Sequence, residues 1–188
     1  MELSGVLLEQ VTLRGRRIRL RECELRGVTI DAAQAPGLTL VDVVLRDCEL
    51  ANIDAREATI RRVRAERCRL VGLRLTGGGT ADLRVVDSTL QLASFAGAGL
   101  QRVVFERVNL AEASFQEARL QEVHFVDCRL TGADFRGASL RRCAIRGASL
   151  DGVLGVAALR GVRMPWEDIV ASAGALAAAL GVEVDEGA

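Results

Sequence analysis

The chain has 188 residues, enough for one domain with a substantial core, and its 25 basic and 25 acidic residues cancel to a formal net charge of zero. This balance excludes a bulk electrostatic attraction to nucleic acid or to an anionic membrane. All the basic residues except one His are arginines, and the aromatic residues are five Phe and one Trp. Because large rings are so few, something other than bulky packing must hold the fold.

Residues 1–9 have neither the basic start nor the apolar run of a secretory signal. No apolar stretch approaches the roughly 18 residues that a membrane span needs. Residues 169–184 come closest, but they are rich in Ala and are followed by acids. We therefore expect a cytoplasmic protein without a membrane partner.

From Leu20 to Leu150, every fifth position except Thr80 is apolar, and a mostly smaller residue lies two positions before it. In the second half the fifth positions are Leu90, Phe95, Leu100, Phe105, Leu110, Phe115, Leu120, Phe125, Leu130, Phe135, Leu140, Ile145 and Leu150. An α-helix would repeat near 3.6 residues and a strand at 2, so neither explains a period of five.

The repeated unit resembles the pentapeptide-repeat family, whose consensus is Ala-(Asp/Asn)-Leu-X-X, over residues 6–164. Residues 133–137 (Ala-Asp-Phe-Arg-Gly) and 148–152 (Ala-Ser-Leu-Asp-Gly) fit it well. The resemblance implies an all-β solenoid, a right-handed quadrilateral β-helix in which each pentapeptide forms one side of a square. We expect about eight coils within residues 1–164, with the fifth-position residue and the residue two before it pointing inward.

The phenylalanines support four sides independently. Phe95, Phe115 and Phe135 are 20 residues apart and so share one side, whereas Phe105 and Phe125 are ten out of phase and belong to the opposite side. Leucines occupy the two remaining sides. We expect the five rings to form a ladder that fills the core without collision.

Charged residues follow the same 20-residue step. Asp47, Arg67, Asp87, Arg107 and Asp127 alternate in sign at one corner of successive coils. Stacked strands lie about 4.8 Å apart, so opposite charges there attract. We therefore expect most of the charge to stabilise the stack.

The register weakens at four places. Val6 with Leu8, and Val11 with Leu13, form inward pairs in a different phase from the rest. Residues 33–37 and 76–80 offer only small or polar residues to the interior, and at 76–80 we expect a bulge or a local irregularity. After Leu150 the phase slips again.

Residues 165–188 change character, and we predict there a helix followed by a short strand. Pro165 suits a first helical turn, and Gly181 is a natural stop. This terminal module can cover the open end of the solenoid or meet a second copy. The candidates for a dimer interface are Trp166, Ile169, Val170, Ala173, Leu176, Leu180, Val182 and Val184, and the alternative role for some of them is packing on the last coil.

No residues suggest catalysis, a metal or another cofactor. The cysteines Cys23, Cys48, Cys68, Cys128 and Cys143 all lie in the small inward column, which indicates buried structural thiols. His124 is the single histidine, on an outward position, and one His cannot build a typical zinc site or a Ser-His dyad. The run of Gly at 77–79 lacks the Lys and the helix of a phosphate-binding loop.

The tail, residues 159–182, resembles the end of the quinolone-resistance pentapeptide proteins, of the mycobacterial type and of the plasmid-borne Qnr type. The resemblance implies a homodimer joined through the terminal helix that imitates DNA, binds DNA gyrase or topoisomerase, and protects it from inhibitors, as quinolone resistance or as antibiotic self-resistance. The uninterrupted register matches the mycobacterial type.

The neutral surface departs from that family, because mimicry of DNA calls for strong negative charge. Candidate contacts for gyrase are the acids Glu112, Glu117, Asp134 and Asp151. One alternative is a structural module that binds another protein. Direct nucleic-acid binding along an Arg-rich side is disfavoured, because that side lacks aromatic residues for stacking.

Overall fold

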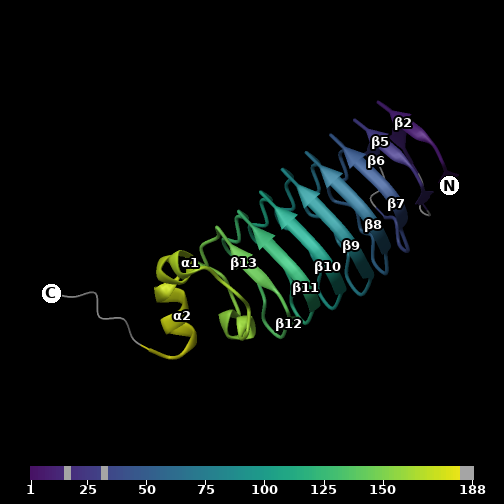
Figure 1. Ribbon diagram of the computed structural model, residues 1–188. Helices are drawn as coiled ribbons and strands as arrows, with labels where there is room; N and C mark the ends of the chain where they lie inside the picture. Colours follow the sequence, from purple (N-terminus) through teal and green to yellow (C-terminus); the bar gives the residue numbers. More distant parts are fainter. Residues whose placement is uncertain (15–17, 31–33, 183–188) are drawn as a thin grey trace.

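The computed structural model describes residues 1–14, 18–30 and 34–182 as a parallel β-solenoid. In Figure 1 the strands stack like rungs along one axis, with the N-terminus at one end and two short helices at the other. The strands are β1 (Glu2–Ser4), β2 (Leu7–Glu9), β3 (Thr12–Leu13), β4 (Arg19–Arg21), β5 (Glu24–Arg26), β6 (Thr29–Ile30), β7 (Thr39–Arg46), β8 (Thr59–Glu66), β9 (Gly79–Val86), β10 (Gly99–Glu106), β11 (Arg119–Val126), β12 (Ser139–Arg141) and β13 (Ala144–Arg146). A 3₁₀ helix, η1 (Val156–Leu159), precedes helices α1 (Trp166–Ala171) and α2 (Ala173–Ala179).

Each coil has four walls, as the sequence predicts. The long strands β7–β11 pair in parallel with a constant step of 20 residues, so Leu100 lies beside Leu120 and Phe105 beside Phe125. Each of them bends once and supplies two walls. Single bridges at the same step, such as Asn109 to Arg129 and Ser114 to Asp134, define the other two.

We number the walls by their inward fifth-position residue. Wall 1 carries Leu100 and Leu120, wall 2 Phe105 and Phe125, wall 3 Leu110 and Leu130, and wall 4 Phe95, Phe115 and Phe135. Along wall 1 the described part of the chain stacks eight strands, in the order β1-β4-β7-β8-β9-β10-β11-β12, so about seven full turns separate the first from the last.

The corners in the described part of the coil turn on a residue in the left-handed region, two positions after the inward residue. At Asp42, Asp47, Asn52 and Glu57, the four consecutive corners of one coil, φ lies between 54° and 58°. The corners on either side of wall 4 are also closed by a turn hydrogen bond, as where the Ala113 N–H donates to the Leu110 carbonyl at 3.0 Å. The corners therefore hold one fixed shape from coil to coil.

The core is the predicted double column. The five phenylalanines are at most 1% exposed, and the column of smaller residues, which holds all five free thiols, is buried over most of its length. Rings of one wall stack at 4.9–5.4 Å between centroids, and rings of the opposed walls meet edge to face at 5.7–6.5 Å. Both are the favourable geometries for aromatic pairs.

The irregular segments behave in different ways. The first coil pairs at a step of 17, with Leu3 beside Leu20 and Leu8 beside Leu25, which explains the shifted phase near the N-terminus. The bulge expected at residues 76–80 is wrong, because β9 keeps register with β8 and β10, and the Thr80 side chain, 4% exposed, fills the inward position. Of residues 33–37, Ala33 lies outside the described residues, and Gln34 continues the ladder through a bridge to Asp54.

The terminal helix predicted as one element is two. The chain turns at Ser172 (φ −105°, ψ 11°), which is fully buried and separates α1 from α2. The predicted stop at Gly181 is confirmed: its φ is 74°, its N–H donates to the Ala178 carbonyl, and the Val182 N–H donates to the Ala177 carbonyl. Of the strand expected at Val182 and Val184, only Val182 lies in the described part of the chain.

Candidate interaction surfaces

Two corners carry ladders of ion pairs. At the corner between walls 2 and 3, Arg67 donates from Nε and Nη2 to the Asp47 carboxylate at 2.7 and 2.9 Å, and Arg107 does the same to Asp87 at 2.6 and 3.0 Å. Each arginine therefore reaches back to the acid of the preceding coil in a two-pronged contact. These hydrogen bonds hold the pKa values of Asp47 and Asp87 below their usual range.

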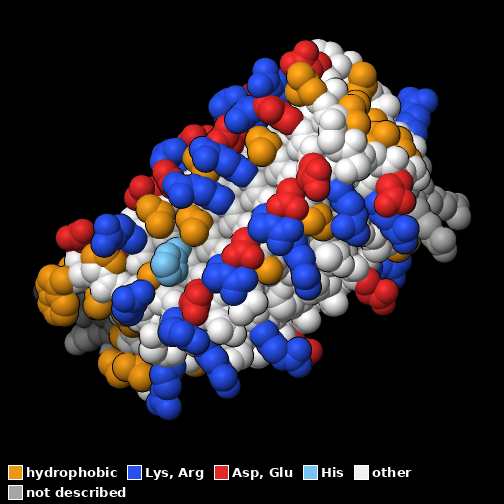
Figure 2. Space-filling view, turned by 45° about the vertical axis from the view of Figure 1, so that its right-hand side comes forward, with side chains coloured by type: hydrophobic (Ala, Val, Ile, Leu, Met, Phe, Trp, Pro, Cys, Tyr) orange, Lys and Arg blue, Asp and Glu red, His pale blue; other side chains and the backbone are white. Residues whose placement is uncertain are grey.

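A second ladder stands at the corner between walls 1 and 2, which the sequence analysis missed. Its pairs are Asp42–Arg62, Asp82–Arg102 and Glu122–Arg142, again with alternating sign and a step of 20. The 20-residue step by which the first ladder was found in the sequence also relates the residues of this second ladder. Figure 2 shows such rows of alternating acidic and basic side chains running along the coil.

Wall 2 lies between the two ladders and adds its own ion pairs. Arg46 contacts both Glu24 and Glu66, while Arg84 contacts Glu106. Opposite charges thus neutralise one another over this half of the surface, which leaves little net field for a charged partner.

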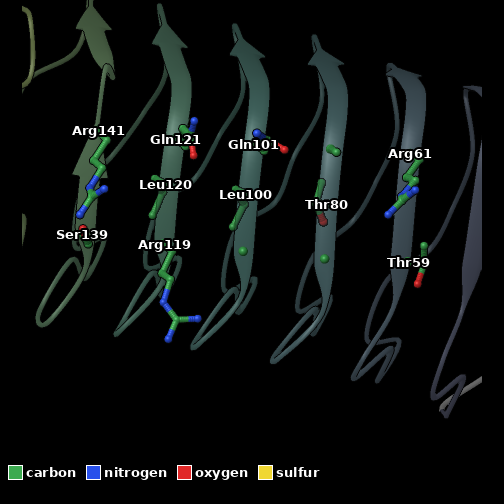
Figure 3. Close-up of a pocket in the computed structure, with 13 residues that line it drawn as sticks. Thr59, Arg61, Thr80, Leu100, Gln101, Arg119, Leu120, Gln121, Ser139 and Arg141 are labelled. Atoms are coloured by element: carbon green, nitrogen blue, oxygen red, sulfur yellow. The ribbon is translucent and has the colours of Figure 1, made fainter.

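Wall 1 differs, because it forms a shallow trough of about 610 Å³ with basic ends. Gly79, Ala81 and Gly99 make its floor low in the middle. Figure 3 shows Arg61 projecting from β8, Arg119 from β11 and Arg141 from β12, with Gln101 and Gln121 between them. This trough was not foreseen as a site, although the excess of arginine on this side was visible in the sequence.

The four acids predicted to contact gyrase do not form one surface. Glu112 and Glu117 are exposed at the corners on either side of wall 4, and Asp151 is exposed on wall 3. Asp134, by contrast, is buried on wall 4, where its carboxylate accepts hydrogen bonds from the Arg136 side chain and backbone and from Gln116. The Arg136 hydrogen bonds lower the Asp134 pKa to about 2, so Asp134 serves the fold and is no free acidic contact.

The C-terminal end presents an apolar face. Trp166, Val170, Leu180 and Val182 are 76%, 57%, 81% and 54% exposed, and Ala173 is exposed beside them. Among the other predicted interface residues, Ile169 and Leu176 are half-buried and line a groove of about 630 Å³ against η1, so they pack at least partly on the last coil. Val184 lies outside the described residues.

Polar side chains join the helices to the last coil. The Gly147 N–H donates to the Asp168 carboxylate at 2.7 Å, and the Leu150 N–H donates to Ser172 Oγ at 3.2 Å. In the interior coils the corresponding N–H groups donate to carbonyls of the next coil, as Asp127 does to Arg146. Asp168 and Ser172 thus accept the hydrogen bonds that, in the interior coils, backbone carbonyls of the following coil accept. The sequence analysis did not assign this role to them.

The described residues show no group of three or more His, Cys, Asp or Glu placed to hold a metal ion. The thiols donate to nearby backbone carbonyls, as Cys23 does to Arg21 at 3.0 Å, and burial raises the pKa of Cys128 and of Cys143. No described helix combines the length and the hydropathy that crossing a membrane requires.

Several solved structures align with the chain at low identity. Two forms of QnrB1, described as a plasmid-mediated fluoroquinolone resistance protein, align at 15% and 14% identity with TM-scores of 0.45 and 0.48; the alignments cover 97% and 94% of this chain and 99% of theirs. The pentapeptide repeat protein Rfr23 of the cyanobacterium Cyanothece 51142 aligns at 16% identity over 88% of each chain, with a TM-score of 0.19.

No curated protein matches the sequence. The family model described as "Pentapeptide repeat region" matches residues 82–154, and the coils before it continue the 20-residue step back to Arg19. Residues 82–154 are therefore a pentapeptide-repeat region, in which the inward fifth-position residues form the buried ladder.

Proposed function

We propose that this protein is a non-enzymatic, cytoplasmic binding protein that dimerises through α1 and α2 and occupies DNA gyrase in place of DNA, protecting it from quinolones or other inhibitors. The observation that carries the proposal is the exposed apolar face of α1 and α2 at one end of an uninterrupted rod. At about 4.8 Å per coil, two rods of about eight coils joined end to end would extend to about 80 Å, the proportions of a duplex segment.

Dimerisation is the first step to test. Large apolar side chains as exposed as Trp166 and Leu180 at the tip of a rod favour burial against a second copy. Leu180→Arg, at a position that the last coil does not need, should convert a dimer to a folded monomer in light scattering. An unchanged mass, or a wild-type monomer, would contradict the proposed interface.

Gyrase protection is tested by supercoiling and DNA-cleavage assays with and without a quinolone. The wild-type protein should inhibit supercoiling at micromolar concentration and reduce quinolone-induced cleavage, and Leu180→Arg should weaken both effects. Glu112→Gln with Glu117→Gln asks whether the exposed corner acids contribute, with Glu22→Gln, at the corner between walls 1 and 2, as a matched change elsewhere. A wild-type protein that neither inhibits nor protects would overturn the proposed partner.

A second candidate is a structural module for a different protein partner. The paired ladders and wall 2 favour it, because they leave that surface close to neutral, whereas gyrase binds a strongly negative polymer. A pull-down from host extract that recovers one protein stoichiometrically, without gyrase, would support this alternative.

A further inference from the structure

The outward side chains of wall 1 form two rows whose order is fixed by the strand register. Starting at the N-terminal strand, the first row is Glu2, Arg19, Thr39, Thr59, Gly79, Gly99, Arg119 and Ser139, and the second is Ser4, Arg21, Val41, Arg61, Ala81, Gln101, Gln121 and Arg141. The rows therefore hold five arginines and one acid, which stands at the extreme N-terminal strand. No other wall of this protein has such an excess of positive charge in its described outward rows.

The five arginines are also available for binding. Arg19, Arg21, Arg61, Arg119 and Arg141 are exposed, and none forms an ion pair with a described residue. The acids nearest to the trough stand at its rims. Asp42 and Asp82 are engaged by Arg62 and Arg102 of the ladder, and Glu57 and Glu117 lie at the opposite corner. The positive charge at the two ends of wall 1 is therefore not neutralised by ion pairs with described residues.

The spacing of the arginines suits a groove with charged edges. Arg61 and Arg119 lie three rungs apart, which is about 14 Å at 4.8 Å per rung. The major groove of B-DNA is about 12 Å wide between its two phosphate backbones. Gly79, Ala81 and Gly99 lie between the basic ends, so the low floor would face the groove while the arginines reach the phosphates on its two sides.

The chemistry of the two rows favours a phosphate backbone over a protein partner. Protein interfaces depend on a few buried aromatic or aliphatic anchors, and Val41, half-buried, is the one large apolar residue in the described rows. Arg, Thr, Ser and Gln are instead the side chains that contact phosphate oxygens. The rows contain no ring on which an unpaired base could stack, which disfavours single strands.

We propose that wall 1 binds the phosphate backbone of duplex DNA without sequence preference. The lack of aromatic residues, which disfavours single-strand binding, is no obstacle to a duplex, whose phosphates need only charge and polar donors. The proposal does not rest on a gyrase contact: of the exposed acids proposed for gyrase, Asp151 lies on wall 3, opposite to wall 1, and Glu112 at the corner next to wall 3, whereas Glu117 stands at the rim of wall 1. One coil could therefore hold DNA on wall 1 and a protein on the opposite side.

Fluorescence anisotropy of the full-length protein with a labelled duplex of about 30 base pairs tests the proposal without gyrase. Three to five phosphate contacts predict that affinity falls about 40- to 500-fold between about 50 and 200 mM salt. The triple change Arg61→Gln, Arg119→Gln and Arg141→Gln should lower the slope of log affinity against log salt by about 3. A single strand of equal length should bind more weakly than the duplex.

The matched control is Arg74→Gln, Arg129→Gln and Arg146→Gln, which removes the same charge from three exposed arginines on walls 4, 3 and 2. This control should bind the duplex nearly as the wild type does. Circular dichroism and thermal unfolding establish that both triple variants remain folded. Equal losses in the two variants, no duplex binding at low salt, or competition by polyglutamate as effective as by unlabelled duplex would each overturn the proposal.

Discussion

The ring of Phe115 lies parallel to that of Phe135, with centroids 4.9 Å apart and 6° between the planes, and meets Phe125 edge on at 5.7 Å and 86°. One side chain thus takes part in stacking along its own wall and in edge-to-face packing across the lumen. Both contacts recur through the five phenylalanines, which makes this half of the coil the most densely filled part of the core.

Replacing Phe115 with Ala should lower the free energy of unfolding by about 3–5 kcal/mol, because it removes a fully buried ring and leaves a cavity among four others. Urea unfolding followed by far-UV circular dichroism measures the loss. Leu92→Ala, at an exposed corner, is the control and should change stability by less than about 0.5 kcal/mol. A loss below about 1 kcal/mol for Phe115→Ala would mean that the ladder is not a stabilising core.

The N-terminal half of the core is less well filled. A cavity of about 40 Å³ is lined by apolar side chains that include Leu45, Ala65 and Val85, successive residues of wall 2. Ala65→Val should fill part of this cavity and raise the free energy of unfolding by about 1 kcal/mol, the value expected from its volume. Thermal unfolding measures the gain.

The matched control for that change is Ala113→Val, at a fully buried position between Ala93 and Ala133 in the tightly packed half. Overfilling there should lower stability by about 1–3 kcal/mol. If both substitutions destabilise the protein equally, the cavity is too small or too rigid to accept a methyl group.

Much of the coil could be predicted because each coil repeats the same pattern of inward and outward side chains. A fifth-position residue such as Leu120 faces inward wherever its neighbours at Leu100 and Leu140 do, so one period places the entire core and the Asp47–Arg67 pair with it. The irregularity predicted at Thr80 is absent because the same register holds there. Backbone pairing to β8 and β10 holds a weak unit in register even when its side chains contribute little.

The surfaces were harder to predict, because they depend on which charges find partners. Asp134 appears exposed in a pentapeptide consensus, yet Arg136 and Gln116 enclose it. Wall 1 shows the opposite effect, since Arg62 and Arg102 engage the nearby acids Asp42 and Asp82, and no described acid forms an ion pair with an outward arginine of wall 1. At the break between the helices, the Ser172 hydroxyl accepts a hydrogen bond from the Leu150 N–H, a long-range contact with no periodic signal.

The free energy of unfolding should fall between about pH 4 and about pH 2, because Asp134 becomes protonated in this range. Its pKa falls from 3.8 to about 2 in the fold, mainly because Arg136 donates to the carboxylate. A carboxyl with a depressed folded pKa contributes stability above its unfolded pKa, and this contribution is lost as the pH falls from about 4 through about 2. Thermal unfolding between pH 7 and 2 should show the midpoint falling in that window.

Asp134→Asn serves as the test of that assignment. This variant should be less stable than the wild type at pH 7, and the difference between the two should shrink as the pH approaches 2, where Asp134 becomes neutral. The aspartates of the ladders are also lowered in pKa, so a residual acid sensitivity is expected in the variant. If the difference in stability between the wild type and Asp134→Asn stays constant with pH, Asp134 does not contribute to the acid sensitivity.

The junction between the last coil and the helices should depend on Asp168 and Ser172, which accept hydrogen bonds from the N–H groups of Gly147 and Leu150. Either residue changed to Ala leaves a donor without a partner, at a cost of about 1–3 kcal/mol. Amide hydrogen exchange should accelerate at Gly147 in Asp168→Ala and at Leu150 in Ser172→Ala, while β8–β10 stay protected. Glu167→Ala, exposed beside Asp168, is the control and should leave both amides unchanged. If exchange at both amides matches the wild type, the helices do not close the end of the coil, and the aggregation of an open strand edge must be prevented elsewhere.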